Sequence, residues 1–355
     1  MDGRCDHADR CLTSTASPAP RVGLDDSRES GHRGTTVAVG HAWRLPLAQV
    51  LKAVTVAMLL LMGAVASAAA PPVVVSSKLS SESAMLGHMI RLLLEDRGIP
   101  TLDRMTLGAT PVVRKALLAG EIDLYVEYTG NAGFFFNRPN DPAWKDLQLG
   151  YELGSKLDLA ANRIIWLPPA PASNAWALAV RRDIATRHRL VTMSDFARWV
   201  RAGGAVKLAC SAEFANGGTL RSLEQTYSFH LAPRQKIVLA GGETAATIGA
   251  AAARTNGINT AMVYGTDGGI VAADLVLLED DRNDQPVYAP VPILREAALL
   301  ARPEIADIVR PLMASFTRES LQALNARVQI DGESAEEVAG DYLRSKGFIG
   351  PARNL

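Results

Sequence analysis

Four aromatic side chains suggest a chemistry for this sequence, because aromatic residues make up only 6% of it. Tyr128 and Tyr264 end predicted strands, Trp176 begins one, and Tyr288 lies between two prolines. Ligands of open α/β sheets bind in the crevice outside the strand ends. Four rings around one crevice would form a cage for a quaternary ammonium ion, which binds ring faces through cation–π attraction. Ordinary packing is the alternative for each ring taken singly.

The sequence motifs of common enzyme classes are absent. G-x-S-x-G, the phosphate-binding P-loop, G-x-G-x-x-G and H-E-x-x-H do not occur. The histidines beyond the N-terminal region, His88, His188 and His230, lack the spacing of metal ligands. Cys210 has no histidine close in sequence to act as its base, so we expect a small buried residue. We therefore expect no catalytic residue, no metal and no cofactor.

The charge balance argues against a nucleic-acid partner. The chain of 355 residues carries 37 Lys and Arg against 37 Asp and Glu, which leaves no basic excess to neutralise phosphates. A hydrophobic fraction of 48% suits a globular protein. The length suggests two domains, at roughly 150 residues each. Three cysteines are too few for a disulfide framework.

Residues 1–68 are expected to be absent from the mature protein. A basic flank, an uncharged apolar run at 53–65 and the small residues at 66–68 (ASA) follow one another. This order, over about residues 44–68, is typical of a secretory signal peptide, and an apolar run of 13 residues is short for a membrane span. An uncleaved signal anchor is the alternative. Because a signal peptide normally begins a chain, we interpret about the first 40 residues as lying upstream of the true translation start.

Beyond this segment the sequence alternates between strand and helix patterns, which predicts an α/β fold with a largely parallel sheet. A β-branched run at 73–75 is followed by helix patterns at 82–97 and 110–120 and by a strand alternation at 122–128. Further patterns continue to residue 346 and form two blocks, with crossings near Asn174 and Asp284.

Nine stretches of the sequence together resemble one known family. Five of them are residues 76–78 (SSK), 107–114 (LGATPVVR), 120–125 (GEIDLY), 127–130 (EYTG) and 264–268 (YGTDG). They resemble the osmoprotectant-binding proteins of ABC importers, the glycine betaine, choline and carnitine binders of the OpuC/ProX/OsmX type. The other four are similar to the YehZ/OsmF branch in particular: 131–136 (NAGFFF), 166–172 (WLPPAPA), 211–214 (SAEF) and 288–290 (YAP). The resemblance covers about residues 73–348.

This resemblance implies an α/β fold of the two-lobed type II periplasmic binding protein kind, with a hinged ligand cleft. Lobe 1 would combine residues 73–175 with 285–350, and lobe 2 would span 176–284. The implied partners are a small quaternary ammonium ligand and an ABC permease in the inner membrane. The mature protein would be a monomer in the periplasm, exported through its cleaved signal peptide.

The resemblance also assigns ligand-binding roles to residues in or beside these motifs: Lys78, Tyr128, Thr129, Asn131, Asn174, Trp176, Tyr264, Thr266 and Tyr288. The four aromatic residues would form the cage, with Trp176 standing where the family typically has a tyrosine. The backbone carbonyl of Asn174 would face the ammonium group, and Lys78 would hold a ligand carboxylate. Asn131 replaces a threonine of the family and keeps a hydrogen-bond donor there.

One departure from the family pattern concerns ligand choice. In much of the family an arginine after the E-F motif pairs with the ligand carboxylate, but residues 213–220 read EFANGGTL, one residue short and without that arginine. A bidentate arginine pair is a large part of zwitterion recognition. Its absence predicts weak glycine betaine binding, or a ligand without a carboxylate. Arg221, in the next helical turn, is the alternative donor.

Three functions remain open on the sequence alone. The leading interpretation is a non-catalytic receptor that closes around a quaternary ammonium osmolyte and delivers it to a permease. An exported lyase or dehydratase on the same fold would need an acid or base in the cleft, with Glu127 and Asp267 as candidates. The third is a sensing subunit that passes a ligand signal to a membrane kinase. A cleft with rings and one lysine favours the receptor.

Overall fold

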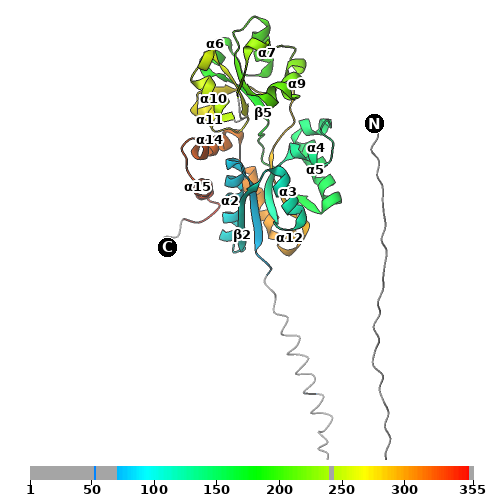
Figure 1. Ribbon diagram of the computed structural model, residues 1–355. Coiled ribbons are helices and arrows are strands. Elements are labelled where there is room, and N and C mark those ends of the chain that lie inside the picture. Colours follow the sequence, from blue (N-terminus) through cyan, green and yellow to red (C-terminus); the bar gives the residue numbers. More distant parts are fainter. Residues whose placement is uncertain (1–51, 53–69, 240–243, 352–355) are drawn as a thin grey trace, which may run out of the picture. The chain divides into compact units, whose positions relative to one another are not determined.

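The computed structural model describes residues 52, 70–239 and 244–351 (Figure 1). The predicted cleavage site at 66–68 and all of the predicted signal peptide except Lys52 lie outside this set. Among the described residues, no helix combines the length and the apolar character needed to cross a membrane.

A five-stranded mixed sheet, in the strand order β2-β1-β3-β10-β4, forms the first half of the fold. Its strands are β1 Val73–Lys78, β2 Thr101–Gly108, β3 Leu124–Tyr128, β4 Ile164–Trp166 and β10 Pro290–Arg295. β1 runs parallel to β2 and β3, whereas β10 runs antiparallel to β3 and β4. Strands from both ends of the described chain therefore share this sheet.

The second sheet has the order β7-β6-β8-β5-β9 and draws all its strands from one continuous segment. They are β5 Trp176–Arg181, β6 Leu208–Ser211, β7 Lys236–Leu239, β8 Thr260–Tyr264 and β9 Leu275–Leu277. β6 is parallel to β7 and β8, and β5 is antiparallel to β8 and β9. Two crossovers connect the sheets, at residues 167–175 and 278–289.

The expectation of a largely parallel sheet is wrong in one respect. In each sheet the strand that follows a crossover, β5 or β10, runs antiparallel to its neighbours. These strands enter from the other sheet rather than through a helix packed on their own sheet, so the right-handed strand–helix–strand rule does not set their direction.

Helices cover both faces of each sheet. Alternate residues of β3 show this, because Leu124 and Val126 join one hydrophobic cluster and Tyr125 joins another. The helices that follow strands of the first sheet are α2 Ser81–Asp96, α3 Thr110–Ala119, α4 Ala132–Phe135, α5 Leu147–Asn162, α12 Glu296–Ala301, α13 Glu304–Ala314, α14 Arg318–Gln329 and α15 Ala335–Ser345. Those of the second are α6 Arg182–His188, α7 Met193–Arg201, α8 Ala212–Asn216, α9 Thr219–Thr226, α10 Thr244–Ala252 and α11 Gly269–Ala272.

Local sequence signals explain where the helices near the site begin and end. Ser80 caps α2 by accepting a hydrogen bond from the Ser83 amide, and a reciprocal pair between Thr317 and Ser320 caps α14. α3 ends at Gly120, whose φ of 77° is left-handed and favours glycine. These caps set the starts of two helices that, as described below, contact the residues of the candidate site.

Candidate functional site

A cavity of about 730 Å³ opens beside the two crossovers and is lined by residues of both sheets. Five aromatic side chains contribute to its wall: Phe134, Trp144, Trp176, Tyr264 and Tyr288. Three of the four rings that the sequence predicted as a cage are therefore brought together here. Asn174, also predicted, lines the same cavity.

Strand register places two of these rings against each other. Trp176 opens β5 and Tyr264 ends β8, and the two residues are direct partners in the antiparallel pair. Their rings stack with centroids 6.2 Å apart and planes inclined by 21°. Phe214 packs edge-on against Trp176 at 5.9 Å, which supports the indole from behind. The indole Nε1 is buried and has no hydrogen-bond partner among the described residues.

Tyr288 is held by bonds between the two crossovers. Its amide donates to Ser173 Oγ at 3.1 Å, and its carbonyl accepts from the Asn174 amide at 2.9 Å. Gly130 gives the ring room, since a Cβ there would lie 2.9 Å from the tyrosine ring. Burial raises the pKa of Tyr288, so the phenol stays neutral around pH 7.

The fourth predicted ring, Tyr128, lies deeper and is not among the described residues that line the cavity. Its hydroxyl donates to Glu82 Oε1 at 2.6 Å, and burial next to that carboxylate raises its pKa well above the usual value. The Lys78 ammonium lies 4.8 Å from the centroid of the Tyr128 ring and forms an ion pair with Glu127. Asn131 Nδ2 donates to the same Glu127 carboxylate at 2.6 Å.

Neither of the two predicted threonines is among the described residues that line the cavity. Thr129 Oγ1 donates to the Val287 carbonyl at 2.7 Å and accepts from the Ala289 amide at 3.1 Å, which fastens the second crossover to the end of β3. Thr266 is buried, and its carbonyl accepts from Asn325 Nδ2 at 2.8 Å. Both residues therefore position segments that carry cavity rings.

The segment without the family arginine forms one edge of the cavity. Gly217 is the C-cap of the short helix α8, and Gly218 is the N-cap of α9. Glu213, Gly218, Thr219 and Ser222 line the cavity from this segment. Arg221, the alternative donor, is exposed and is not one of the described lining residues.

The charged side chains of the cavity are mostly acidic. Asp141, Glu213 and Asp284 line it together with one lysine, Lys145. Asp141 pairs with Arg138 at 2.9 Å, and buried Asp284 lies 3.7 Å from the Lys145 ammonium. Glu213 has no ion-pair partner among the described residues. The cavity therefore combines an excess of acidic side chains with aromatic rings, which suits a cation.

Sequence reasoning missed the contribution of Phe134 and Trp144. Phe134 is 66% exposed, which is unusual for a large apolar side chain. Trp144 is buried and donates through Nε1 to the Arg138 carbonyl at 2.6 Å. The run of three phenylalanines at 134–136 is the sequence signal for an aromatic contribution from this segment.

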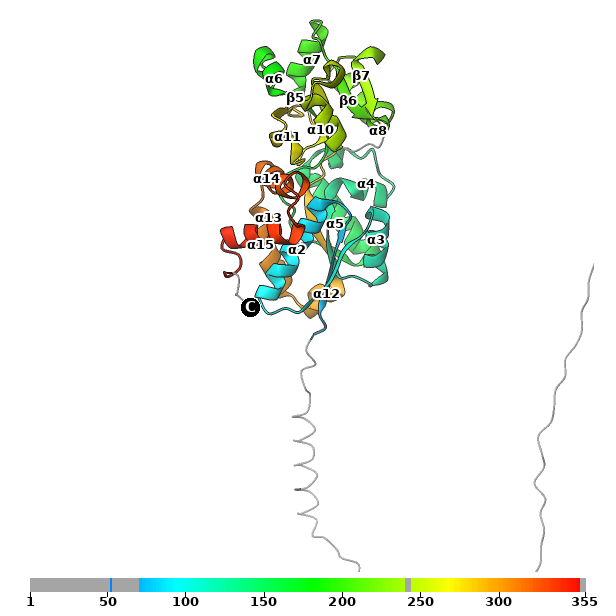
Figure 2. The same cartoon turned by 60° about the vertical axis from the view of Figure 1, so that its left-hand side comes forward.

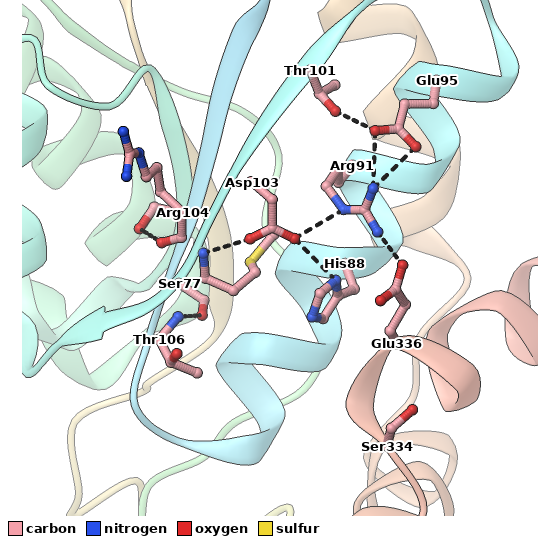
Figure 3. Close-up of polar contacts among 12 residues, drawn as sticks. Ser77, His88, Arg91, Glu95, Thr101, Asp103, Arg104, Thr106, Ser334 and Glu336 are labelled. Carbon is pink, nitrogen blue, oxygen red and sulfur yellow. Dashed lines mark hydrogen bonds and ion pairs between the residues drawn. The ribbon is translucent and has the colours of Figure 1, made fainter.

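The polar groups outside the cavity have structural roles. Asp103 on β2 lies 3.3 Å from Arg91 Nε and 3.8 Å from His88 Nδ1 (Figure 3). Arg91 also pairs with Glu95 at 2.9 Å and with Glu336 on α15. This network ties β2, α2 and α15 together. Within the described ranges, no group of three or more His, Cys, Asp or Glu side chains could hold a metal ion, and burial raises the pKa of the Cys210 thiol.

Comparison with known proteins gives four consistent results. The family described as "Substrate binding domain of ABC-type glycine betaine transport system" matches residues 71–345. The glycine betaine-binding protein YehZ of Escherichia coli strain K12 is 48% identical over 273 residues, which cover 77% of this chain and 90% of that protein. The solved structure of apo YehZ from E. coli has a TM-score of 0.75 and covers 79% of this chain and 100% of that one. A crystal structure described as a glycine betaine/carnitine/choline ABC transporter, 23% identical, has a TM-score of 0.69 and covers 78% of this chain and 100% of that one.

Proposed function

The chain belongs to the family of substrate-binding domains of ABC-type glycine betaine transport systems, and from this premise we propose that it selects a quaternary ammonium cation. Membership confirms the resemblance read from the sequence motifs, and the two-lobed periplasmic binding protein fold is confirmed with it. The protein is a substrate-binding component of a glycine betaine-type ABC transporter and not an enzyme. The lyase alternative is thereby set aside.

The observation that carries the proposed ligand class is the wall of the cavity. The rings of Trp176, Tyr264 and Tyr288 line the cavity, and Glu213 adds a carboxylate without an ion-pair partner among the described residues. A trimethylammonium group gains cation–π attraction from the rings and Coulomb attraction from the carboxylates. A ligand carboxylate gains neither, because the family arginine is missing from the segment at 213–220. Choline-like cations should therefore bind more tightly than glycine betaine.

The proposed mechanism is closure of two lobes around the ligand. Lobe 1 would comprise residues 73–175 with 285–350, lobe 2 residues 176–284, and the hinge the two crossovers. A ligand that contacts rings on both sides of the crossovers favours the closed state by its differential affinity for it. The closed, monomeric protein would then dock on an inner-membrane permease.

A ligand screen tests this proposal. Glycine betaine, choline, carnitine, ectoine and proline are added singly, and the thermal unfolding midpoint is recorded, since a specific ligand stabilises the folded state by mass action. Calorimetry then gives the dissociation constants. We expect the choline constant to lie below the betaine constant, with betaine in the high micromolar range or above. A submicromolar betaine constant, or no response to any quaternary ammonium compound, would overturn the proposal.

Periplasmic location is proposed from the signal-peptide pattern over about residues 44–68. We infer cleavage before Ala69, or one or two residues later, because the small residues at 66–68 follow the apolar run. The intact mass of the exported protein is the measurement. A mass that still includes residues 1–68 would contradict both the cleavage and the reading of the first 40 residues.

A further inference from the structure

Three amide side chains on one face of α14 bind the turn that follows Tyr264. Gln322 Nε2 donates to the Gly265 carbonyl at 2.8 Å, and Asn325 Nδ2 donates to the Thr266 carbonyl at 2.8 Å. Gln329 Oε1 accepts from the Gly268 amide at 3.1 Å. Spacings of three and four residues place these side chains on the same side of the helix. We call this row, with the turn at 264–268, the amide clasp.

Two of the three amides of the clasp are buried, whereas Gln329 is exposed. Gln322 is 6% exposed and Asn325 is 1% exposed. Both amide nitrogens are hydrogen-bonded, as buried polar groups require, whereas Asn325 Oδ1 has no partner among the described residues. Gly268 permits the approach, because a Cβ at this position would lie 2.2 Å from the Ala326 backbone nitrogen. α11, which begins at the next residue, lies beside α14 (Figure 2). The helix is therefore a third link between the two sheets, in addition to the crossovers.

The clasp is joined to two further candidate ligand residues, Tyr128 and Asn174, through Glu82. The Asn325 amide also donates to Glu82 Oε2 at 2.5 Å. The other oxygen of this carboxylate accepts from the Tyr128 hydroxyl at 2.6 Å and from Asn174 Nδ2 at 3.1 Å. Glu82 is 3% exposed, so these three donors take the place of water around a buried charge. One amide, Asn325, thus connects the Tyr264 turn to Tyr128 and Asn174.

We propose that Asn325, with Gln322 and Gln329, forms a set of positioning residues that fix the Tyr264 ring relative to Tyr128 and Asn174. The inference rests on the proposed function, in which the Tyr264 ring and Asn174 line the cavity that takes the ligand ammonium. Because the clasp spans the two sheets, any change in the angle between them has to strain or break its hydrogen bonds. Ligand affinity is therefore set in part by residues that do not touch the ligand.

The clasp itself can be tested without a ligand. Asn325→Ala removes both donated hydrogen bonds, and Ala323→Asn, at an exposed position of the same helix, is the matched control. Hydrogen exchange is followed on both variants and on the unmodified protein. We expect faster exchange of the 265–269 amides in Asn325→Ala, with the second sheet as protected as before. Unchanged protection of this turn would overturn the clasp.

Choline titration tests the effect on the site. We expect Asn325→Ala to weaken choline binding by about tenfold, and Ala323→Asn to leave it unchanged. Asn325→Asp should weaken binding at least as much, since two carboxylates then meet. Adding Glu82→Gln to Asn325→Asp should recover part of the loss, because the new amide at position 82 donates to the new carboxylate at position 325.

The two proposals fail in distinguishable ways. A double variant no better than Asn325→Asp, or an Asn325→Ala variant with unmodified choline affinity, would overturn the positioning role. Absence of choline binding by the unmodified protein would instead overturn the proposed function. Hydrogen exchange of the 265–269 amides would still test whether the clasp holds this turn.

Discussion

Placing an arginine at Gly218 should reverse the ligand preference of the cavity. Gly218 lines the cavity at the start of α9, with φ −79° and ψ −27°, values that any residue adopts. A Cβ at this position meets nothing within 4 Å, whereas a Cβ at Gly217 would lie 2.4 Å from the Glu213 carbonyl oxygen. Gly218→Arg therefore adds a guanidinium to the cavity edge without strain, and no inserted residue is needed.

The magnitude follows from two opposing terms. A hydrogen bond to a charged group contributes roughly 1.5 to 3 kcal/mol, so a new arginine–carboxylate contact should tighten glycine betaine by about tenfold to a hundredfold. The ammonium group of either ligand meets a like charge, and choline has no carboxylate contact to offset this repulsion. At a separation of about 10 Å and an effective dielectric constant between 20 and 80, this repulsion amounts to roughly 0.4 to 1.7 kcal/mol. Choline should weaken by about twofold to twentyfold.

Calorimetry with both ligands on the same preparations measures the reversal. Gly218→Gln is the control, because it adds a long polar side chain without a charge, and it should move betaine by less than about threefold. Raising the salt concentration should reduce the effect of arginine on choline, since exposed charges are screened. If Gly218→Arg changes betaine and choline by the same factor and in the same direction, the cavity charge does not select the ligand and the reasoning is wrong.

Three further predictions concern the cage, a titrating histidine and a buried ion pair. Tyr264→Ala should weaken choline binding by about twofold to thirtyfold, from a cation–π contribution of roughly 0.5 to 2 kcal/mol, and Tyr264→Phe should lose less because the ring face remains; equal calorimetric losses would refute a π contact. Burial lowers the pKa of His88, although the negative charges of Glu336 and Asp103 oppose this shift. As pH falls below about 6.5 the unfolded chain therefore takes up a proton before the folded protein does, and the stability of the folded state declines. His88→Gln should flatten this part of a profile of melting temperature against pH. Arg114→Met removes the bidentate partner of the fully buried Asp158 carboxylate, which Arg114 contacts at 2.7 and 2.5 Å. The free energy of unfolding, measured in urea, should fall by about 3 to 5 kcal/mol, and a loss under about 1 kcal/mol would contradict the burial argument.

Much of the fold was predictable because its helices carry strong local signals. The helix pattern at 82–97 corresponds to α2 Ser81–Asp96, and the pattern at 110–120 to α3 Thr110–Ala119. β2 was missed because this edge strand is mostly exposed and lacks apolar alternation. Without a buried face, a strand leaves no period-two pattern in the sequence.

β10 was missed for a different reason, its prolines. Pro290 and Pro292 argue against a central strand, because proline cannot donate to a ladder. The structure accommodates these prolines because the neighbouring strand, β4, ends at Trp166 before it reaches them. Their carbonyls accept from Ala170 and Leu167, which lie in the crossover beyond β4. The segment opposite the two prolines is the crossover and not a strand. The amide hydrogens that the prolines lack are therefore not needed for a regular ladder of hydrogen bonds.

Three of the five rings that line the cavity could be named from the sequence, but their surroundings could not. Trp176 and Tyr264 are 88 positions apart (264 − 176), and only the antiparallel register of β5 and β8 brings them together. The hydrogen-bond partners of Tyr128 and Lys78 are also distant in the sequence. Glu82 lies 46 positions before Tyr128, and Glu127 lies 49 positions after Lys78. Such contacts depend on tertiary packing, which leaves no local pattern.

The position of Lys78 sets an energetic condition on the proposed cage. Its ammonium already lies over the Tyr128 ring and pairs with Glu127, so a ligand ammonium cannot occupy that face until the lysine turns away. Glu127 would then keep its hydrogen bonds from Tyr125 and Asn131 but lose its countercharge. A zwitterion offers the displaced lysine a carboxylate in return, whereas choline offers none. On this argument choline binds through the rings that line the cavity, Trp176, Tyr264 and Tyr288, while glycine betaine reaches Tyr128 only by exchanging one ion pair for another, which contributes little net affinity.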